Sequence, residues 1–393
     1  MEASLQPDNK KIRTVSVLGS TGSVGCNTLD LVQRYPDQFR VIALTANRNF
    51  KDLAEQAIRF NARMAVVADT ECYHQLKEAL SGTNIQVGAG PEALIEAASL
   101  PADWVMASIV GAAGLEPTLS AIRRGAIVAL ANKECLVCAG DLVMKEVIEH
   151  NATLLPVDSE HNAIFQVFDF EQPEKISHVT LTASGGPFYQ MSLEQMAGVT
   201  PKQAVTHPNW DMGAKISVDS ATMMNKGLEL IEAYHLFPVS KDKIEIIVHP
   251  QSVIHSMVSY VDGSVLAQLG SPDMRTPISY TLAWPERIGT PAKQLDLAHL
   301  GRLDFFEPDM ARFPALKLAR EALQTGGSAP TILNAANEIA VHAFLEGKIG
   351  FLDISGIVEK TLEVMGSVEL KCLQTVLEIN QEARRISAGF IGN

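Results

Sequence analysis

No stretch of this 393-residue chain approaches the roughly 20 consecutive apolar residues that a membrane-spanning helix requires. The first residues, Met1-Glu2-Ala3-Ser4, also lack the basic segment and apolar run of a secretory signal. Basic residues are in the minority, 32 against 45 acidic ones, and the net charge of −13 opposes non-specific binding to nucleic acid or anionic lipid. We therefore expect a cytoplasmic protein with neither a membrane nor a nucleic-acid partner.

Cysteine is scarce, with five scattered residues, as expected of reduced thiols in a reducing compartment. Cys135-Leu136-Val137-Cys138 has the spacing of redox and zinc sites, but no second pair or histidine cluster completes such a site. We interpret the pair as two packed thiols. The hydrophobic content of 47% and the chain length indicate a globular protein of two or three domains.

The first part of the chain alternates short β-rich runs with stretches of helical periodicity, which predicts an α/β fold with a doubly wound parallel sheet. The predicted strands are Thr14–Leu18, Arg40–Leu44, Met64–Ala68, Trp104–Ile109, Ala126–Leu130 and Thr153–Val157, and the predicted helices include Asn27–Arg34, Asp52–Phe60 and Leu115–Arg123. Ligands of such folds bind at the carboxyl ends of the strands. Residues 1–157 are therefore expected to form a Rossmann-like domain.

The pattern then changes to strands separated by long loops, which predicts a central α+β domain at 158–283 with an antiparallel sheet. Its predicted strands are Ile176–Thr182, Ile244–Val248, Ser252–Tyr260 and Val265–Gln268. Residues 284–312 contain prolines and little periodicity, so they are expected to be a connector. A C-terminal helical bundle at 313–393 is predicted from helical runs at Pro314–Gln324, Pro330–Leu345, Asp353–Val364 and Cys372–Ile386.

A glycine-rich loop, Gly19-Ser20-Thr21-Gly22-Ser23-Val24-Gly25, follows the first strand and opens a helix. Such a loop lets a pyrophosphate approach the free amides of a helix N-terminus. After the second strand, Asn47-Arg48-Asn49 stands where an acidic residue would select NAD, and an arginine there suits the 2′-phosphate of NADPH. An ordinary glycine turn and a plain surface arginine are the alternatives.

Two carboxylates, Asp158 and Glu160, lie two residues apart in a segment interpreted as extended, so they are expected on one face. Converging carboxylates of this kind bind Mg²⁺ or Mn²⁺. A third, Glu229, lies in the segment 219–232, interpreted as one capped helix with Ser220 near its start and Lys226 beside Glu229. Ser220 and Lys226 suit a phosphate; the alternatives are solvated carboxylates and a surface Lys226–Glu229 pair.

Two loops between these segments suggest further binding groups. Ser184-Gly185-Gly186-Pro187 offers amides and a hydroxyl to an anion, unless it is an ordinary turn. The loop 198–214 carries His207, Trp210 and Met212, and a tryptophan and a methionine in a polar loop are typical of a lid that excludes water from a substrate.

Taken together, these motifs resemble one family, 1-deoxy-D-xylulose 5-phosphate reductoisomerase. The matching segments are the loop 19–25, Ala131-Asn132-Lys133-Glu134, Pro156–Ala163, Ser184–Phe188, His207-Pro208-Asn209-Trp210, Met223–Glu229 and Leu333-Asn334-Ala335-Ala336-Asn337-Glu338. The resemblance implies a dimer with an NADPH-binding domain, a catalytic and dimerising domain and a helical domain. It also implies conversion of 1-deoxy-D-xylulose 5-phosphate to 2-C-methyl-D-erythritol 4-phosphate, in the non-mevalonate route to isoprenoids.

The resemblance further assigns residues to roles. Metal (Mg²⁺, Mn²⁺ or Co²⁺) would be held by Asp158, Glu160 and Glu229. The substrate would be bound by Lys133, Ser159, Glu160, Ser184, His207, Trp210, Met212, Ser220, Asn225, Lys226 and Glu229. NADPH would contact Thr21, Gly22, Ser23, Val24, Asn47, Arg48, Asn49, Asn132, Glu134 and Gly213. At Asn47 the sequence departs from the family, which often carries glycine there.

Some alternatives remain open from the residues themselves. A non-catalytic NADPH sensor would explain the glycine loop but not the carboxylates, and a metal-dependent aldolase or isomerase would explain the carboxylates but not the loop. The general acid and base are equally open among Lys133, Glu160 and a bound water. A reductoisomerase uses both sets of residues.

Overall fold

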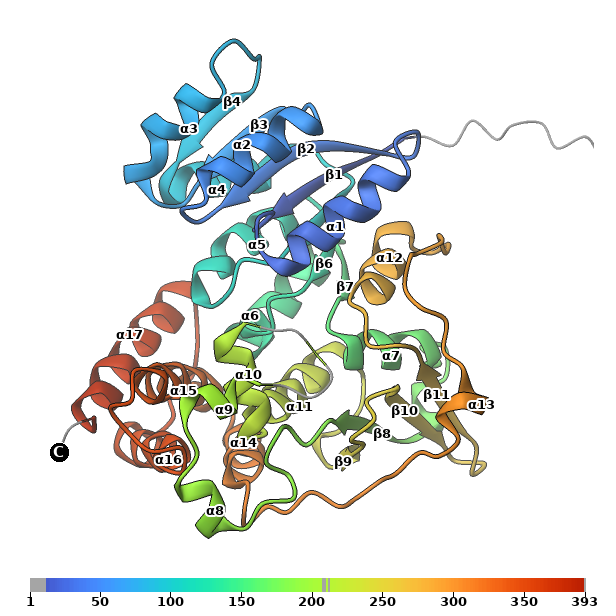
Figure 1. Ribbon diagram of the computed structural model, residues 1–393, viewed down its shortest axis with the longest axis vertical. Helices are drawn as coiled ribbons and strands as arrows, with labels where there is room; N and C mark the ends of the chain where they lie inside the picture. The colour runs from blue at the N-terminus through green and yellow to red at the C-terminus, as the bar shows by residue number, and fades with distance from the viewer. Residues whose placement is uncertain (1–11, 207–209, 211–212, 392–393) are drawn as a thin grey trace, which may run out of the picture. The chain divides into compact units, whose positions relative to one another are not determined.

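The computed structural model describes residues 12–206, 210 and 213–391 (Figure 1). Its contacts divide the chain into two compact units, and the chain passes between them more than once. Unit 1 comprises Met1–Asn132, Glu146–Val157 and Met274–Pro291, and unit 2 comprises Lys133–Lys145, Asp158–Asp273 and Ala292–Asn393. Residues 274–283, predicted in the central domain, thus pack within unit 1.

Unit 1 contains a seven-stranded sheet with the order β4-β3-β2-β1-β5-β6-β7, in which all paired strands are parallel. The predicted doubly wound sheet is therefore confirmed. Its strands are β1 Arg13–Leu18, β2 Phe39–Ala46, β3 Met64–Val67, β4 Gln86–Ala89, β5 Trp104–Ala107, β6 Ile127–Leu130 and β7 Thr153–Pro156. The strand order reverses between β1 and β5, and in open sheets of this kind ligands bind beside such a switch point.

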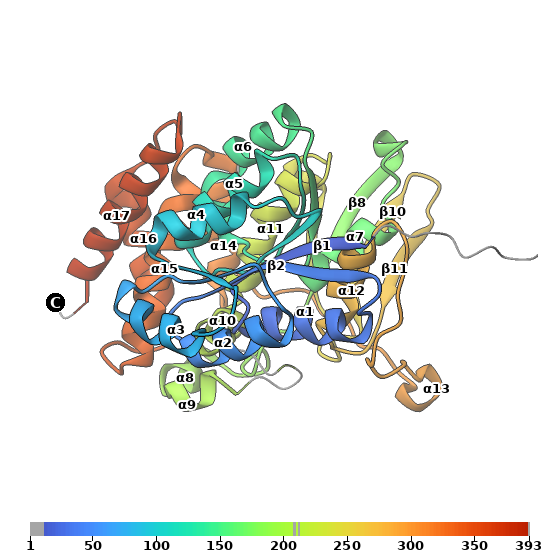
Figure 2. The same cartoon turned by 90° about the horizontal axis from the view of Figure 1, so that it is seen from above.

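Helices cover both faces of this sheet (Figure 2). On one side lie α1 Ser23–Arg34, α2 Phe50–Arg59 and α3 Tyr73–Ala79; on the other lie α4 Gly90–Ser99 and α5 Leu115–Ile122. Short 3₁₀ turns, η1 Thr70–Cys72 and η2 Ala112–Gly114, connect some of them. Strands β3 and β5 are buried throughout, as parallel strands between helix layers should be, whereas the edge strand β4 is only partly buried.

A distant segment completes unit 1. Helix α12 (Arg275–Ala283) and the residues after it supply backbone carbonyls to one buried and one half-buried side chain of the sheet. The indole of Trp104 donates to the carbonyl of Thr281 at 2.9 Å, and the guanidinium of Arg13 donates to the carbonyls of Leu282 and Trp284 at 2.6 and 3.0 Å. These bonds explain why 274–291 belongs with unit 1.

Unit 2 contains a four-stranded sheet in the order β11-β10-β8-β9. Its strands, β8 Ile176–Ala183, β9 Ile244–Val248, β10 Ile254–Tyr260 and β11 Val265–Leu269, lie where the sequence predicts them. The predicted antiparallel arrangement is wrong for one pair, because β8 and β9 run parallel. The long helical crossover between these two strands returns the chain in the same direction.

The helices before and after β8 carry the candidate site. They are α7 Ser159–Val167, α8 Leu193–Ala197, α9 Pro201–Ala204, α10 Ala214–Ala221 and α11 Met224–Leu236, with 3₁₀ turns η3 Pro173–Lys175 and η4 Lys241–Lys243. The helix predicted across 219–232 is in fact two helices. Met223 adopts a left-handed conformation (φ 61°) between them, so Ser220 lies in the last turn of α10 instead of beginning a helix.

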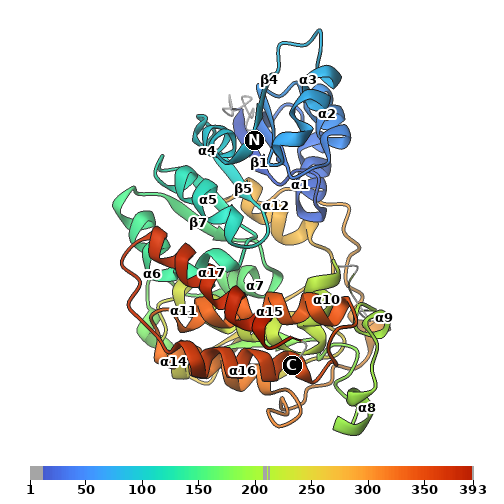
Figure 3. The ribbon, with the colours of Figure 1, turned by 90° about the vertical axis from the view of Figure 1, so that its left-hand side faces the viewer.

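The predicted C-terminal helices are confirmed and pack side by side in Figure 3. They are α14 Pro314–Thr325, α15 Ala329–Leu345, α16 Asp353–Met365 and α17 Leu373–Gly389, and the short α13 Leu297–Leu300 precedes them. Helix α6 (Glu134–Glu149) is kinked at Ala139, and Cys135 and Cys138 are both buried thiols. None of the helices that the structure describes is long and apolar enough to cross a membrane.

Candidate active site

The glycine-rich loop of unit 1 lies at the carboxyl end of β1, where α1 begins at Ser23. Gly19 has a φ of +90°, and a Cβ added there would lie 2.8 Å from the carbonyl oxygen of Ser108. A Cβ on Gly25 would lie 2.3 Å from the oxygen of Gly19, so the turn admits only glycine at both positions. Thr21, Gly22, Ser23 and Val24 stand at the helix N-terminus, whose free amides favour an anion.

Arg48 follows β2 in the same unit, between Asn47 and Asn49. Its Nε lies 3.2 Å from Asp69 and its Nη2 3.3 Å from Glu71, while 65% of its side chain is exposed. Exposed ion pairs of this kind are weak, so Arg48 can exchange these partners for a phosphate. Asn49 caps α2, because its side chain accepts a hydrogen bond from the backbone amide of Asp52.

The three predicted metal ligands converge in unit 2, where ligand atoms of Asp158, Glu160 and Glu229 all lie within 4.8 Å of one another. The reason differs from the predicted extended segment. Asp158 is the N-cap of α7 and Glu160 lies in its first turn, so a helix start turns both carboxylates toward Glu229. A fold that gathers three carboxylates in this way suits a hard divalent cation.

Two lysines share this centre with the carboxylates. Lys133 Nζ lies 2.7 Å from Asp158 and 3.3 Å from Glu229, and it donates to the amide oxygen of Asn225 at 2.7 Å. Lys226 Nζ lies 3.1 Å from Glu160 and is also paired with Glu229. We call Asp158, Glu160, Glu229, Lys133 and Lys226 the carboxylate–lysine centre. Both Lys226 and Glu229 are buried, which excludes the alternative of a surface pair.

Burial and charge shift the ionisation of this centre. Burial, followed by repulsion from Glu160, raises the pKa of Glu229 to about 7. Burial also opposes ionisation of Asp158, but attraction to Lys133 outweighs it and holds the pKa of Asp158 well below its usual range. Three carboxylates against two ammonium groups leave room for additional positive charge, which is the electrostatic requirement of a cation site.

A buried pair, His161 and Glu232, lies beside the centre and was given no role from the sequence. His161 Nδ1 lies 3.2 Å from Glu232 Oε2, and its Nε2 lies 2.9 Å from the carbonyl oxygen of Glu229. Burial lowers the pKa of His161, but Glu232 more than reverses this and raises it to about 9. The spacing of Glu229 and Glu232, three residues apart, places them on one helical face, but the sequence gives no indication of their long-range partner His161 in α7.

Two hydroxyl groups of unit 2 lie close together. Ser184 Oγ lies 3.5 Å from Ser220 Oγ, and the amide of Gly186 donates to Ser184 at 3.2 Å. A Cβ on Gly186 (φ +67°) would lie 2.6 Å from the carbonyl oxygen of Ser220. The glycine turn 184–187 therefore fits directly against the end of α10 and brings both serines together.

The structure describes some of the other predicted residues but not all of them. Trp210 has its ring centroid 6.2 Å from that of His255, whereas His207 and Met212 lie outside the described residues. Ser159 donates to Glu160 at 2.6 Å. Asn132, in unit 1, donates to the carbonyls of Ile109 and Gly111 at 2.6 and 2.9 Å.

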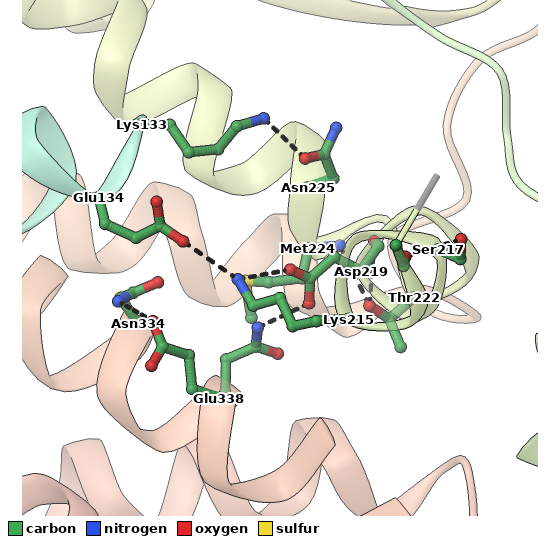
Figure 4. Close-up of polar contacts among 12 residues, drawn as sticks. Lys133, Glu134, Lys215, Ser217, Asp219, Thr222, Met224, Asn225, Asn334 and Glu338 are labelled. Carbon is green, nitrogen blue, oxygen red and sulfur yellow. Dashed lines mark hydrogen bonds and ion pairs between the residues drawn. The ribbon is translucent and has the colours of Figure 1, made fainter. Parts of the chain in front are cut away.

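Glu134 and Gly213 belong to unit 2. Gly213 precedes α10, and Lys215 in the first turn of α10 pairs with Glu134 at 3.5 Å (Figure 4). Sequence reasoning did not find Lys215, which has no motif around it.

The Rossmann-like sheet, its glycine turn and the carboxylate–lysine centre indicate a class, the dinucleotide-fold oxidoreductases that also carry a cation-binding centre. Comparison with protein families narrows this class. The family model described as 1-deoxy-D-xylulose 5-phosphate reductoisomerase matches residues 15–140, and models of C-terminal domains of the same family match residues 154–237 and 269–386. The chain belongs to the 1-deoxy-D-xylulose 5-phosphate reductoisomerase family.

Individual relatives match over almost their full length. The reductoisomerase of Rhodospirillum centenum is 63% identical over 97% of this chain and 94% of its own, and that of Zymomonas mobilis is 62% identical over 96% and 98%. A solved Zymomonas mobilis structure, in complex with NADPH, has a TM-score of 0.93 and 58% identity, covering 98% of this chain and 100% of that one. A DOX-P reductoisomerase complex with NADPH, fosmidomycin and magnesium has a TM-score of 0.91 and 44% identity, covering 96% and 98%.

Proposed function

We propose that this protein catalyses the NADPH-dependent rearrangement and reduction of 1-deoxy-D-xylulose 5-phosphate to 2-C-methyl-D-erythritol 4-phosphate, a step toward isoprenoid precursors. The observation that carries this proposal is the convergence of Asp158, Glu160 and Glu229 with Lys133 and Lys226 in a chain that also contains a dinucleotide-type glycine turn. Neither an NADPH sensor nor a redox-independent aldolase uses both features.

The cofactor is NADPH, which supplies a hydride when bound. The glycine turn fits its pyrophosphate, since a Cβ at Gly19 or Gly25 would collide with backbone atoms of the turn or its neighbour. Arg48 suits the 2′-phosphate because its side chain is 65% exposed, so its ion pairs with Asp69 and Glu71 hold it only weakly. The full set of proposed contacts is Thr21, Gly22, Ser23, Val24, Asn47, Arg48, Asn49, Asn132, Glu134 and Gly213.

Asp158, Glu160 and Glu229 would hold a divalent cation, Mg²⁺, Mn²⁺ or Co²⁺. The donor set fits, because three carboxylate oxygens are hard ligands, and burial, followed by repulsion from Glu160, raises the pKa of Glu229 in the cation-free protein. When bound, such a cation polarises a carbonyl and acidifies a neighbouring hydroxyl. These are the requirements of carbon–carbon cleavage and rejoining in a hydroxyketone.

The lysines and Glu160 would move protons. Lys133 Nζ is fixed by Asp158 and Asn225, and although burial alone would lower its pKa, Asp158 and Glu229 raise it well above the ordinary value. Lys133 therefore stays protonated and can donate to a developing oxyanion. Glu160, which accepts a hydrogen bond from the hydroxyl of Ser159, is the candidate general base that removes a proton.

The phosphate of the substrate would lie where Ser184 and Ser220 approach each other. Binding energy gained at this remote group would orient the reacting carbons. His207, Asn225 and Lys226 complete the proposed substrate set with Lys133, Ser159, Glu160 and Glu229. Trp210 and Met212 belong to the proposed lid, which would exclude water from the intermediates.

The organisation of the protein follows the same proposal. We assign residues 1–157 to cofactor binding, 158–283 to catalysis and dimerisation, 284–312 to a connector and 313–393 to a helical domain, in a cytoplasmic homodimer. Strand β11 supports dimerisation, since it is an edge strand with Val265, Leu266 and Leu269 exposed. An exposed apolar edge of a sheet is a natural pairing surface.

The test is oxidation of NADPH, followed by absorbance, with 1-deoxy-D-xylulose 5-phosphate and Mg²⁺, repeated after chelation. We expect metal-dependent turnover, with 2-C-methyl-D-erythritol 4-phosphate identified by mass spectrometry. The variant Glu160→Gln removes one proposed ligand, and Glu174→Gln, on an exposed carboxylate of the same unit, is the matched control. Turnover that survives both chelation and Glu160→Gln would contradict the proposed function.

A further inference from the structure

A chain of polar side chains joins three helices of unit 2, and Figure 4 labels Glu134, Lys215 and Asp219 of this chain. Lys215 Nζ in α10 lies 2.8 Å from Asp219 Oδ2 and 3.5 Å from Glu134 Oε1 in α6. Asn337 Nδ2 in α15 donates to the other oxygen of Asp219 at 2.7 Å. We call Glu134, Lys215, Asp219 and Asn337 the Lys215 network; of these, the proposed reaction uses only Glu134.

The network is held in a largely buried setting. Asp219 is 1% exposed and Asn337 is fully buried, so the carboxylate depends on Lys215 and Asn337 for compensation. Burial would lower the pKa of Lys215, but Asp219 and then Glu134 outweigh it and raise the pKa above the ordinary value. Glu134 therefore faces a lysine that stays positively charged at physiological pH.

Helix α15 provides the fixed end of the network. Its Thr331 hydroxyl donates at 2.8 Å to the carbonyl of Cys138, just before the kink of α6. The carboxylate of Glu338, also in α15, accepts a hydrogen bond from the side-chain amide of Asn334 at 3.0 Å and is paired with Arg384 of α17. Because α15 thus contacts α6 through Thr331 and α10 through Asn337, Glu134 and Lys215 are anchored on one common helix.

We propose that Lys215 is a positioning residue for the cofactor. Held by Asp219 and Asn337, it fixes the orientation of the Glu134 carboxylate, so that Glu134 accepts a hydrogen bond from a hydroxyl group of NADPH. This inference rests on the proposed function, which makes Glu134 a cofactor contact. It assigns a task to Lys215, to Asp219 and to Asn337 of the segment Leu333–Glu338, none of which the proposed reaction uses directly.

The primary test is the double variant Lys215→Met/Asp219→Asn. Removing both Lys215 and Asp219 avoids leaving the carboxylate of Asp219 buried without its lysine, so the variant should fold. We expect the dissociation constant for NADPH, from fluorescence titration without substrate, to rise about tenfold because one charge-assisted contact loses its alignment. The KM for the sugar phosphate at saturating NADPH, and the thermal shift on adding Mg²⁺, should stay within about twofold, since the carboxylate–lysine centre is intact.

Two further variants sharpen the result. Lys215→Arg keeps the positive charge beside Glu134 and should bring the NADPH dissociation constant to within about threefold of the wild-type value. Lys241→Met is the matched control, because Lys241 is another partly buried lysine of unit 2 and donates to the carbonyl of Leu323 at 2.6 Å. We expect the control to bind NADPH as the wild type does.

An unchanged NADPH dissociation constant in the double variant would overturn the inference, as would parallel losses of NADPH, substrate and Mg²⁺ binding, which would assign the network to folding alone. If the double variant does not fold, Asn337→Leu decides. It removes only the donor to Asp219 and should weaken NADPH binding about threefold, and no change there would also overturn the inference. Wild-type protein that fails to bind NADPH would instead refute the proposed function.

Discussion

Replacing Glu229 by glutamine should separate the stability of the protein from its affinity for a divalent cation. Glu229 is fully buried between Lys133 and Lys226, and repulsion from Glu160 contributes to its raised pKa. In the cation-free protein, Glu229→Gln removes this repulsion together with the attraction to both lysines. These effects oppose each other, so we expect the free energy of unfolding to change by no more than about 1 kcal/mol.

Cation binding should respond very differently. Loss of one of three carboxylate ligands should weaken Mg²⁺ binding at least about 100-fold. Mutation of residues that only hydrogen-bond to metal ligands already lowers metal affinity about 10- to 100-fold. At a Mg²⁺ concentration 100 times the wild-type dissociation constant, binding stabilises the wild type by about 2.7 kcal/mol but the variant by only about 0.4 kcal/mol. With an unfolding entropy of about 2.1 cal/mol/K per residue over 393 residues, the rise in Tm should fall correspondingly, from about 3 °C to about 0.5 °C.

The assay is thermal unfolding over a Mg²⁺ series, starting from protein treated with a chelator. Glu321→Gln is the matched control, because Glu321 is a helical carboxylate of unit 2 with 54% of its side chain exposed. A Glu229→Gln variant with the full wild-type Mg²⁺ shift would show that the cation binds elsewhere. If Glu229→Gln lowered the free energy of unfolding by several kcal/mol in the absence of Mg²⁺, repulsion and attraction would not balance at this residue.

Three further predictions follow from features outside that comparison. Arg48→Ala should reduce the preference for NADPH over NADH about tenfold, measured as the ratio of their kcat/KM values, and an unchanged ratio would contradict the role of Arg48. In the folded protein the pKa of His161 is raised from 6.5 to about 9, so the stabilisation from its pair with Glu232 should be complete below pH 6.5 and be lost as the pH rises through 9. In the presence of a chelator, the free energy of unfolding of His161→Asn protein should lose this part of its pH dependence. A variant that keeps the same pH dependence would show that His161 is not its source. Leu266→Lys on β11 should shift the protein from dimer to monomer in sedimentation equilibrium, whereas a dimer that persists unchanged would place the interface elsewhere.

Much of the fold could be predicted because strands buried on both faces are apolar runs bounded by turn residues. Strand β4 (Gln86–Ala89) was missed, since it is short, contains Gly88 and is only partly buried. The direction of β9 relative to β8 was also missed, because the alternation of apolar and polar residues along a strand does not indicate whether the neighbouring strand runs parallel or antiparallel. That relation depends on the helical crossover between them, which is a property of the whole unit.

The candidate site was predictable in its members but not in its local geometry. Asp158 and Glu160 were expected to converge along an extended segment, yet they converge at the N-terminus of α7. The left-handed turn at Met223 has no sequence signature, because it occurs at a residue that rarely adopts that conformation. The pairs His161–Glu232 and Lys215–Glu134 join residues far apart in the chain, so no spacing could have indicated them.

The segment 274–291 has a consequence for synthesis on the ribosome. The N-terminal sheet emerges first, but the carbonyls that accept the indole of Trp104 and the guanidinium of Arg13 belong to Thr281, Leu282 and Trp284. Until those residues leave the exit tunnel, the nascent sheet has a buried N–H group with no acceptor from that segment and an uncovered apolar face against which α12 will pack. A truncated chain that ends at residue 157 should therefore be prone to aggregation, and completion of the first unit has to wait for most of the second to be translated.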